Sequence, residues 1–488
     1  MREQPNIILF VLDTVRASSV SAYSEFSPKT TPFFDSFAEE NVMYEQCIST
    51  APWTLPAHAS LFTGLFPSNH GVNSWEDSLS PSIDTLAGLL HSEGYQTVGV
   101  TNNSWVSDLF GLARGFDDFY KIWQLIQTEK DLIETSRLSK DKSSVETLKH
   151  ITKDILSGNP VVNTINGFYG KFLHNRHDHG ATRINKIVKK WLIDEWDREN
   201  PFFLFANYLE PHLEYDPPKE TALKFLNDSD LNKARSVPQE PLEHMFGKNP
   251  INDDDLSLLQ QLYKAELLYL DRKLEEIYEF LDEIGAREDS VVVFLGDHGE
   301  NIGEHGLMSH FYSLHDTLVR VPCAVKTGDG HQRLVESQIQ TTDLFSLILH
   351  EAGVDKSEVT NPNGAILPPP YAEEGRKYAI SELLGTNPPE KAVDRRTDGD
   401  YDATKFQDYQ HPRQAIRTPK RKLVHKADGS RTTYKINGFN EKQTTLQDKE
   451  DLLEGIEPWI SKSKIDSGGE DNKLDGSTKS RLQDLGYL

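Results

Sequence analysis

Short runs of apolar residues alternate along this chain with longer segments in which apolar residues recur at helical spacing. The runs at 7–12, 202–206 and 291–295 have the length of a strand and contain no polar residue. Such runs are typical of strands buried on both faces of a parallel sheet. Helical spacing over 31–40 and 253–284 predicts helices between them. The alternation predicts an α/β fold, a sandwich in which helices flank a mainly parallel central sheet.

The pattern changes towards the end of the chain. Prolines cluster at 368–370, and three short runs between 415 and 436 read as antiparallel strands. We therefore expect a main domain over 1–360 and a small α+β subdomain over 361–488, with an antiparallel sheet and a terminal helix. A weakly punctuated segment rich in Lys, Asp and Ser, about 123–180, is expected to be an insertion in the main domain.

The composition is strongly acidic. Among 488 residues, 52 are Lys or Arg and 76 are Asp or Glu, so the net charge is 52 − 76 = −24. This charge argues against nucleic acid or an anionic membrane as a partner. It is compatible with adaptation to high salt, because repulsion between surface carboxylates is tolerable when it is screened.

Cysteine content and hydropathy bear on the compartment. Cys47 and Cys323 are far apart and lack metal-ligand spacing, which favours neither a disulfide framework nor a zinc site. No stretch approaches the roughly 18 apolar residues of a membrane span, and the run at 7–12 is shorter than a signal-peptide core. We expect a cytoplasmic protein without a membrane span; a mature chain whose leader has been removed would look similar.

One polar turn opens onto an apolar, small-residue run. Thr54 begins a predicted helix that ends at Gly64, and Pro56 lies in its first turn, where proline is tolerated. A helix N-terminus favours an anion, through its backbone N–H groups and the macrodipole. A hydroxyl there is suitably placed to attack a phosphate or sulfate ester. The alternative is that Thr54 only caps the helix.

Acidic and imidazole side chains follow two of the buried strands. Asp13 comes directly after the run at 7–12, and Asp297 and His298 follow the run at 291–295. Because ligands collect beyond the carboxyl ends of parallel strands, these residues are expected to hold one divalent cation, Mg²⁺, Ca²⁺ or Mn²⁺. That cation would lower the pKa of the Thr54 hydroxyl and activate it. The alternative for an Asp-His pair after a strand is an ordinary hydrogen-bonded loop.

Three motifs together resemble sulfatases of the alkaline phosphatase superfamily. They are the opening run at 5–13, the run Thr-Leu-Pro-Ala-His-Ala-Ser-Leu-Phe-Thr-Gly at 54–64, and Gly-Asp-His-Gly-Glu at 296–300. The segments at 303–307 and 320–322 continue the match. The resemblance implies the sandwich fold of that superfamily, a metal-dependent ester hydrolase or transferase, and a small-molecule or glycan ester as substrate.

The nucleophile position departs from the family. Its signature is Cys or Ser, any residue, Pro, any residue, Arg, and the Cys or Ser is oxidised to formylglycine. This chain has Thr54 and His58 at the two ends of that motif, and threonine cannot give the aldehyde because its β-carbon carries a methyl group. Threonine is similar to the nucleophile of related phosphotransferases and phosphodiesterases. Phosphate mono- or diester chemistry is therefore favoured; sulfate-ester hydrolysis with unmodified Thr54, or a catalytically silent anion- or glycan-binding protein, are the alternatives.

Further site residues are implied by the resemblance. Thr14 replaces the second of two aspartates, so either one ligand is lost or Thr14 coordinates through its hydroxyl. His58 is expected to contact substrate, and Asn102 stands roughly where the family has cationic substrate contacts. His212 resembles a substrate-contacting histidine, and His310 the Lys or His that reaches the transferred group or protonates the leaving oxygen. The alternative for both histidines is a role in loop structure.

Overall fold

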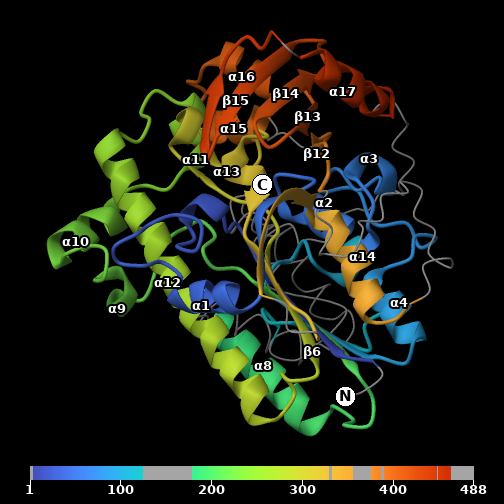
Figure 1. Ribbon diagram of the computed structural model, residues 1–488. Helices are drawn as coiled ribbons and strands as arrows, with labels where there is room; N and C mark the ends of the chain where they lie inside the picture. Colours follow the sequence, from blue (N-terminus) through green and yellow to red (C-terminus); the bar gives the residue numbers. More distant parts are fainter. Residues whose placement is uncertain are drawn as a thin grey trace, which may run out of the picture.

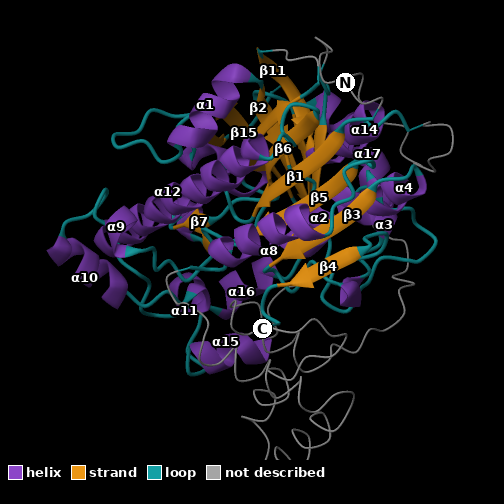
Figure 2. Cartoon of the chain, turned by 90° about the horizontal axis from the view of Figure 1, so that it is seen from below, coloured by secondary structure: helices purple, strands orange, loops and turns teal. Residues whose placement is uncertain are grey.

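The computed structural model describes residues 4–124, 178–328, 332–354, 375–385, 390–447 and 449–462. Within these ranges a nine-stranded sheet runs through the main domain in the order β11-β2-β10-β6-β1-β5-β3-β4, and β9 pairs with β2 (Figures 1 and 2). Its strands are β1 Asn6–Leu12, β2 Val42–Ile48, β3 Gln96–Thr101, β4 Asp118–Lys121, β5 Phe202–Tyr208, β6 Ser290–Gly296, β9 Arg320–Val321, β10 Cys323–Lys326 and β11 Arg333–Gln340. The predicted α/β architecture is confirmed.

The centre of the sheet is parallel. β1 pairs in parallel with β5 on one side and β6 on the other, and β5 pairs in parallel with β3. Leu12 at the end of β1 lies opposite both Tyr208 and Gly296, so these three strands end at one edge. β10 runs antiparallel to β6 and to β2, which makes the sheet mixed. The sequence analysis did not predict β10, because its apolar run is only three residues long.

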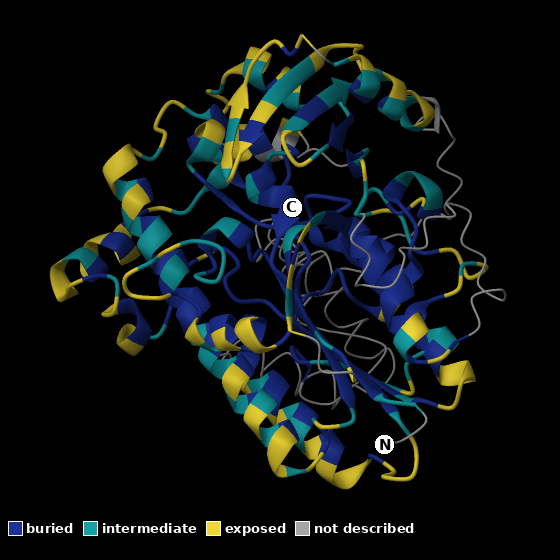
Figure 3. Ribbon diagram, viewed as in Figure 1, coloured by how far each residue is buried: buried dark blue, intermediate teal, exposed yellow. Residues whose placement is uncertain are grey.

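Side-chain alternation divides the core into two layers. In β1, Ile7, Leu9 and Val11 pack on one face of the sheet, and Ile8, Phe10 and Leu12 pack on the other. The odd-numbered face is covered by α2 Thr54–Thr63, α4 Leu86–Ser92 and α14 Thr341–Glu351, and the even-numbered face by α1 Pro32–Glu40, α8 Ala181–Asp194 and α12 Asp253–Glu283 (Figure 1). The strands between these layers are buried along most of their length (Figure 3). Within a strand such as β1, successive side chains therefore enter opposite layers of the core.

Short elements complete the main domain. They are α3 Pro67–His70, α9 Lys219–Ala222, α10 Asp228–Ser236, α11 Pro241–Phe246, α13 Asp316–Val319, the hairpin strands β7 Asn301–Ile302 and β8 Met308–Ser309, and 3-10 turns at Ala17–Ser19, Asp108–Phe110 and Glu304–Gly306. No helix in the described ranges is both long enough and apolar enough to cross a membrane.

The small C-terminal sheet is antiparallel, as expected. Its strands are β12 Ala379–Leu383, β13 Arg413–Arg417, β14 Arg421–Lys426, β15 Arg431–Asn437 and β16 Asn440–Gln443, in that order, accompanied by α15 Glu390–Arg396, α16 Ala403–Tyr409 and α17 Glu450–Lys462. The predicted domain boundary at 360, most of the predicted insertion and the predicted helix near 479–485 lie outside the described residues.

Buried charges join this sheet to the main domain. Asp316, the first residue of α13, accepts hydrogen bonds from Arg417 Nη2 at 2.8 Å and from Lys422 Nζ at 2.5 Å. Glu441 accepts from Lys422 Nζ at 2.8 Å and from the backbone N–H of Asp316 at 2.8 Å. The two acids and two bases balance in charge, and each side chain is at most 3% exposed. The network attaches β13, β14 and β16 to the segment that follows His310.

Candidate active site

Thr54 is the first residue of α2, and its hydroxyl does not cap the helix. The N-cap is Trp53, which makes no side-chain capping hydrogen bond. The Thr54 hydroxyl instead donates to Asp13 Oδ2 at 3.4 Å and lies 3.2 Å from His298 Nε2. Thr54 is fully buried. The structure thus contradicts the alternative in which Thr54 serves only as a cap.

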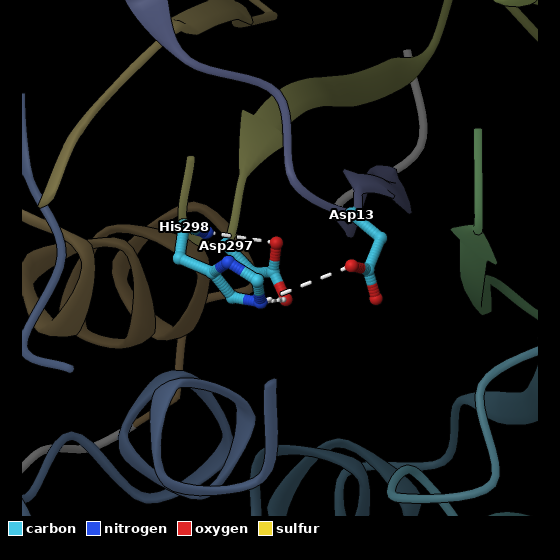
Figure 4. Close-up of side chains that lie close together, drawn as sticks. All are labelled: Asp13, Asp297 and His298. Atoms are coloured by element: carbon cyan, nitrogen blue, oxygen red, sulfur yellow. Dashed lines mark hydrogen bonds and ion pairs between the residues drawn. The ribbon is translucent and has the colours of Figure 1, made fainter. Parts of the chain in front are cut away.

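Asp13, Asp297 and His298 converge at the edge where β1 and β6 end. Each contributes a ligand atom, and these atoms lie within 4.8 Å of one another. His298 Nε2 is 3.4 Å from Asp297 Oδ2 and 3.8 Å from Asp13 Oδ1. Figure 4 shows the three side chains turned towards one another. The predicted grouping of these three residues is present in the structure.

The electrostatics of the group fit a cation. Burial raises the pKa of Asp13 to about 8, against the lowering effect of a hydrogen bond from Asn103. Burial, and then the charge of Asp13, raise the pKa of Asp297 well above its ordinary value, whereas burial lowers the pKa of His298 well below its own. Asp13 Oδ1 and Asp297 Oδ2 have no hydrogen-bond partner among the described residues. Two buried carboxylates with an unpaired oxygen each, beside a neutral imidazole, match the donor set of a divalent cation.

Tyr263 of α12 holds the loop that follows β1. Thr14 has a positive φ of 57°, its backbone N–H donates to Asp297 Oδ1 at 3.3 Å, and its carbonyl accepts from Tyr263 Oη at 2.7 Å. Tyr263 Oη in turn accepts from the backbone N–H of Arg16 at 3.2 Å. Thr14 Oγ1 is buried and makes no hydrogen bond within the described part of the chain. Coordination through this hydroxyl stays a prediction.

The residue that reaches the site after β3 is Asn103, where the sequence analysis named Asn102. Asn103 Nδ2 donates to Asp13 Oδ2 at 2.6 Å and to Thr54 Oγ1 at 3.2 Å. The side-chain amide of Asn102 donates instead to the backbone carbonyl of His179. In β3, the even-numbered residues Val98 and Val100 face the α8 layer. Asn102 is the next even-numbered residue and faces the same layer, whereas Asn103 faces α2. Counting alternation from Val98 and Val100 would have identified Asn103.

His58 lies one helical turn after Thr54, beneath the candidate nucleophile. Its Nδ1 is 3.0 Å from the Thr54 carbonyl oxygen and 3.5 Å from Asp297 Oδ2. The ring packs edge to face on Phe62 and Phe205, at centroid distances of 6.1 and 5.9 Å. Burial lowers its pKa to about 4, so a neutral ring replaces the family's arginine. These contacts support α2 and Asp297; the predicted substrate contact stays a prediction.

His310 and His212 complete a row of buried imidazoles. The His310 ring centroid lies 4.5 Å from that of His298 and 5.4 Å from that of His212. His310 Nδ1 is 3.1 Å from Glu300 Oε1, and His212 Nδ1 pairs with the carbonyl oxygen of Leu213. The structure therefore brings both histidines beside the metal-ligand group, and their roles in catalysis stay predictions. From the sequence, Glu300 was only the last residue of the Gly-Asp-His-Gly-Glu motif, without a role of its own.

The chain is similar in sequence and in fold to known proteins. The Sulfatase family model matches residues 5–354. The uncharacterized sulfatase YidJ of Escherichia coli is 24% identical over 378 residues, which are 73% of this chain and 69% of that protein.

Two solved structures share the fold. A protein in complex with its substrate D-glucosamine-2-N,6-O-disulfate superposes with a TM-score of 0.64 at 16% identity, covering 96% of this chain and 100% of that one. A phosphonate monoester hydrolase of Agrobacterium radiobacter has a TM-score of 0.63 at 20% identity, covering 94% and 95%. At this coverage the overlap extends past residue 354, where the family match ends, into the C-terminal part of the chain.

Proposed function

Because the chain belongs to the sulfatase family and carries threonine at the nucleophile position, we propose that it is a metal-dependent hydrolase or transferase of phosphate mono- or diesters. Thr54 is the nucleophile in this proposal. The observation that carries it is the position of Thr54 Oγ1, at the start of α2 and within 3.4 Å of both Asp13 Oδ2 and His298 Nε2.

Attack begins at the Thr54 hydroxyl. Asp13 Oδ2, to which the hydroxyl donates, takes its proton, and the oxygen forms a bond to phosphorus as the bond from phosphorus to the alcohol oxygen breaks. The N–H groups at the start of α2 stabilise the charge that develops on the non-bridging oxygens, and the amide of Asn103 holds Asp13 and Thr54 in place. A divalent cation held by Asp13, Asp297 and His298 would polarise one of those oxygens and lower the pKa of the Thr54 hydroxyl.

The departing alcohol oxygen needs a proton, which His310 supplies in this scheme. Water then attacks the phosphothreonine and gives one proton to His310, and phosphate is released as the Thr54 oxygen takes its proton back from Asp13. An alcohol in place of water turns the hydrolysis into phosphoryl transfer. His212, 5.4 Å from the His310 ring between centroids, contacts the transferred group or the alcohol.

Sulfate-ester hydrolysis with an unmodified threonine is the second candidate. It is favoured by the family itself and by a structural relative that was solved with a disulfated glucosamine as its substrate. The phosphonate monoester hydrolase supports attack at phosphorus. The chemistry of the nucleophile decides for phosphorus, because a threonine cannot become formylglycine. A small-molecule or glycan ester is the substrate class under both readings.

The test uses 4-nitrophenyl phosphate, bis(4-nitrophenyl) phosphate and 4-nitrophenyl sulfate, each with Mg²⁺, Mn²⁺ or Ca²⁺, and the mass of the intact protein. We expect turnover of a phosphate ester and a mass gain of one phosphoryl group, both lost in Thr54→Ala. Thr63→Ala is the matched control, because Thr63 lies at the far end of α2 and its hydroxyl bonds the Ala59 carbonyl. Turnover of the sulfate alone would select the second candidate, and metal binding without any turnover would select the silent one.

A further inference from the structure

Glu300 is a fully buried carboxyl group to which the scheme above assigns no role. We infer that Glu300 is a positioning residue for His310: its bond to Nδ1 holds the ring so that Nε2 serves the leaving oxygen. The inference rests on the proposed function, because it concerns the general acid of that reaction.

The β7–β8 hairpin determines this pairing. Asn301 lies opposite Ser309 in the antiparallel ladder, and Ile302 lies opposite Met308. Glu300 directly precedes the first of these paired residues and His310 directly follows the last, and Glu300 Oε1 lies 3.1 Å from His310 Nδ1. The side chain of Asn301 also donates to the Ser309 carbonyl at 3.2 Å, which ties the two strands at this level. The hairpin therefore brings Glu300 and His310 together at its open end.

The Glu300 end of the hairpin is itself held in place. Arg16 Nη1 donates to the Glu300 carbonyl at 3.2 Å and to Glu304 Oε1 at 2.6 Å. Arg16 belongs to the loop that carries Asp13, and its Nε donates to Ser19 Oγ at 2.7 Å. The buried guanidinium of Arg16 thus links the loop that carries Asp13 to the backbone of Glu300.

The two ring nitrogens of the imidazole form their hydrogen bonds in diverging directions, and Glu300 bonds one of them, Nδ1. With Nδ1 turned to Glu300, Nε2 points away from it, on the side of the ring opposite that contact. Removal of the Glu300 carboxyl group takes away this constraint on the ring orientation and on the tautomer.

The experiment compares Glu300→Ala, Glu300→Gln and His310→Gln by kcat/KM, which reports the steps up to loss of the alcohol. Glu266→Gln is the matched control, because Glu266 is equally buried but accepts a bond from the backbone of Asp216. Phenyl phosphate, whose leaving group needs a proton, is set against 2,4-dinitrophenyl phosphate, whose leaving group does not.

We expect Glu300→Ala to lower kcat/KM for phenyl phosphate by about 10- to 100-fold and to leave 2,4-dinitrophenyl phosphate within about threefold. Glu300→Gln keeps an oxygen that accepts from Nδ1 and should recover part of the loss. His310→Gln should lower kcat/KM for phenyl phosphate further than Glu300→Ala does, and should likewise have little effect on 2,4-dinitrophenyl phosphate. An equal loss on both substrates would overturn the inference, because a buried acid with a purely structural role weakens the enzyme without regard to the leaving group.

A second readout is independent of turnover. The ring ¹⁵N resonances of His310, identified by their absence in His310→Gln, should shift in Glu300→Ala, shift less in Glu300→Gln and stay in place in Glu266→Gln. Unchanged His310 resonances in Glu300→Ala would refute the inference even if Thr54 is phosphorylated. If the wild type shows no phosphoryl-Thr54 mass but the His310 resonances shift in Glu300→Ala, the proposed function is refuted and the pairing of Glu300 with His310 stands.

Discussion

Removing one charge from the network of Asp316, Arg417, Lys422 and Glu441 should strongly destabilise the protein. In the variant Asp316→Asn, Arg417 and Lys422 keep two buried positive charges against the single negative charge of Glu441. Three contacts lose their ionic character: those from Arg417 Nε at 3.1 Å, Arg417 Nη2 at 2.8 Å and Lys422 Nζ at 2.5 Å. Breaking a buried pair in this way typically costs about 3–5 kcal/mol.

The measurement is urea unfolding, read as the change in midpoint at constant slope. The control is Asp228→Asn, which breaks the exposed pair between Lys219 and Asp228, at side-chain exposures of 62% and 71%. That loss should stay below about 1 kcal/mol. The double variant Asp316→Leu with Arg417→Met leaves Lys422 and Glu441 as a balanced pair, and should be more stable than Asp316→Asn alone. Equal midpoints for Asp316→Asn and Asp228→Asn would refute the reasoning.

The same network has a predictable pH dependence. Burial opposes ionisation of Asp316, but the charges of Arg417 and Lys422 outweigh it and lower its pKa. The pKa of Glu441 falls from 4.5 to about 2, because Lys422 and His315 outweigh burial there. A lowered folded-state pKa gives stability that is present above the unfolded pKa and is lost as the pH falls through the folded one. Between pH 5 and about pH 2, the wild type should therefore lose more of its unfolding free energy than Asp316→Asn does; parallel curves would contradict this.

Three further results are expected. Asn103→Ala removes a donor to Asp13 and Thr54 and should lower kcat/KM by about 100-fold or more, whereas Asn102→Ala should have a much smaller effect; the reverse order would restore the assignment made from sequence. Removal of the metal with a chelator should abolish turnover. Restoring the metal at about 100 times its Kd should raise the unfolding free energy of the wild type by about 2.7 kcal/mol, but not that of Asp297→Asn. An equal gain in both proteins would place the cation elsewhere. With 76 acidic against 52 basic residues, the unfolding midpoint should rise between dilute buffer and molar KCl, and an unchanged midpoint would exclude salt adaptation.

Local pattern alone was enough to predict the centre of the fold and the edge where the site lies. The apolar runs that became β1, β5 and β6 are long enough and uniform enough to be buried on both faces, so a parallel sheet is the arrangement that accepts them. Because parallel strands end at a common edge, the residues after β1 and β6 could be grouped before any coordinates were known. Thr54 could be placed at a helix start because Pro56 and Gly64 mark the two ends of that helix.

Tertiary structure decided what depends on one residue of register or on contacts between distant segments. Asn103 faces Thr54 and Asn102 does not, since successive side chains in and after β3 enter opposite layers. Glu300 meets His310 because the β7–β8 hairpin brings its two ends together, and Tyr263 reaches Thr14 because α12 packs against the loop after β1. The balance of Asp316 and Glu441 against Arg417 and Lys422 joins the C-terminal sheet to α13, across about 100 residues of chain. Such pairings leave no local periodicity, so the sequence shows the residues but not which of them meet.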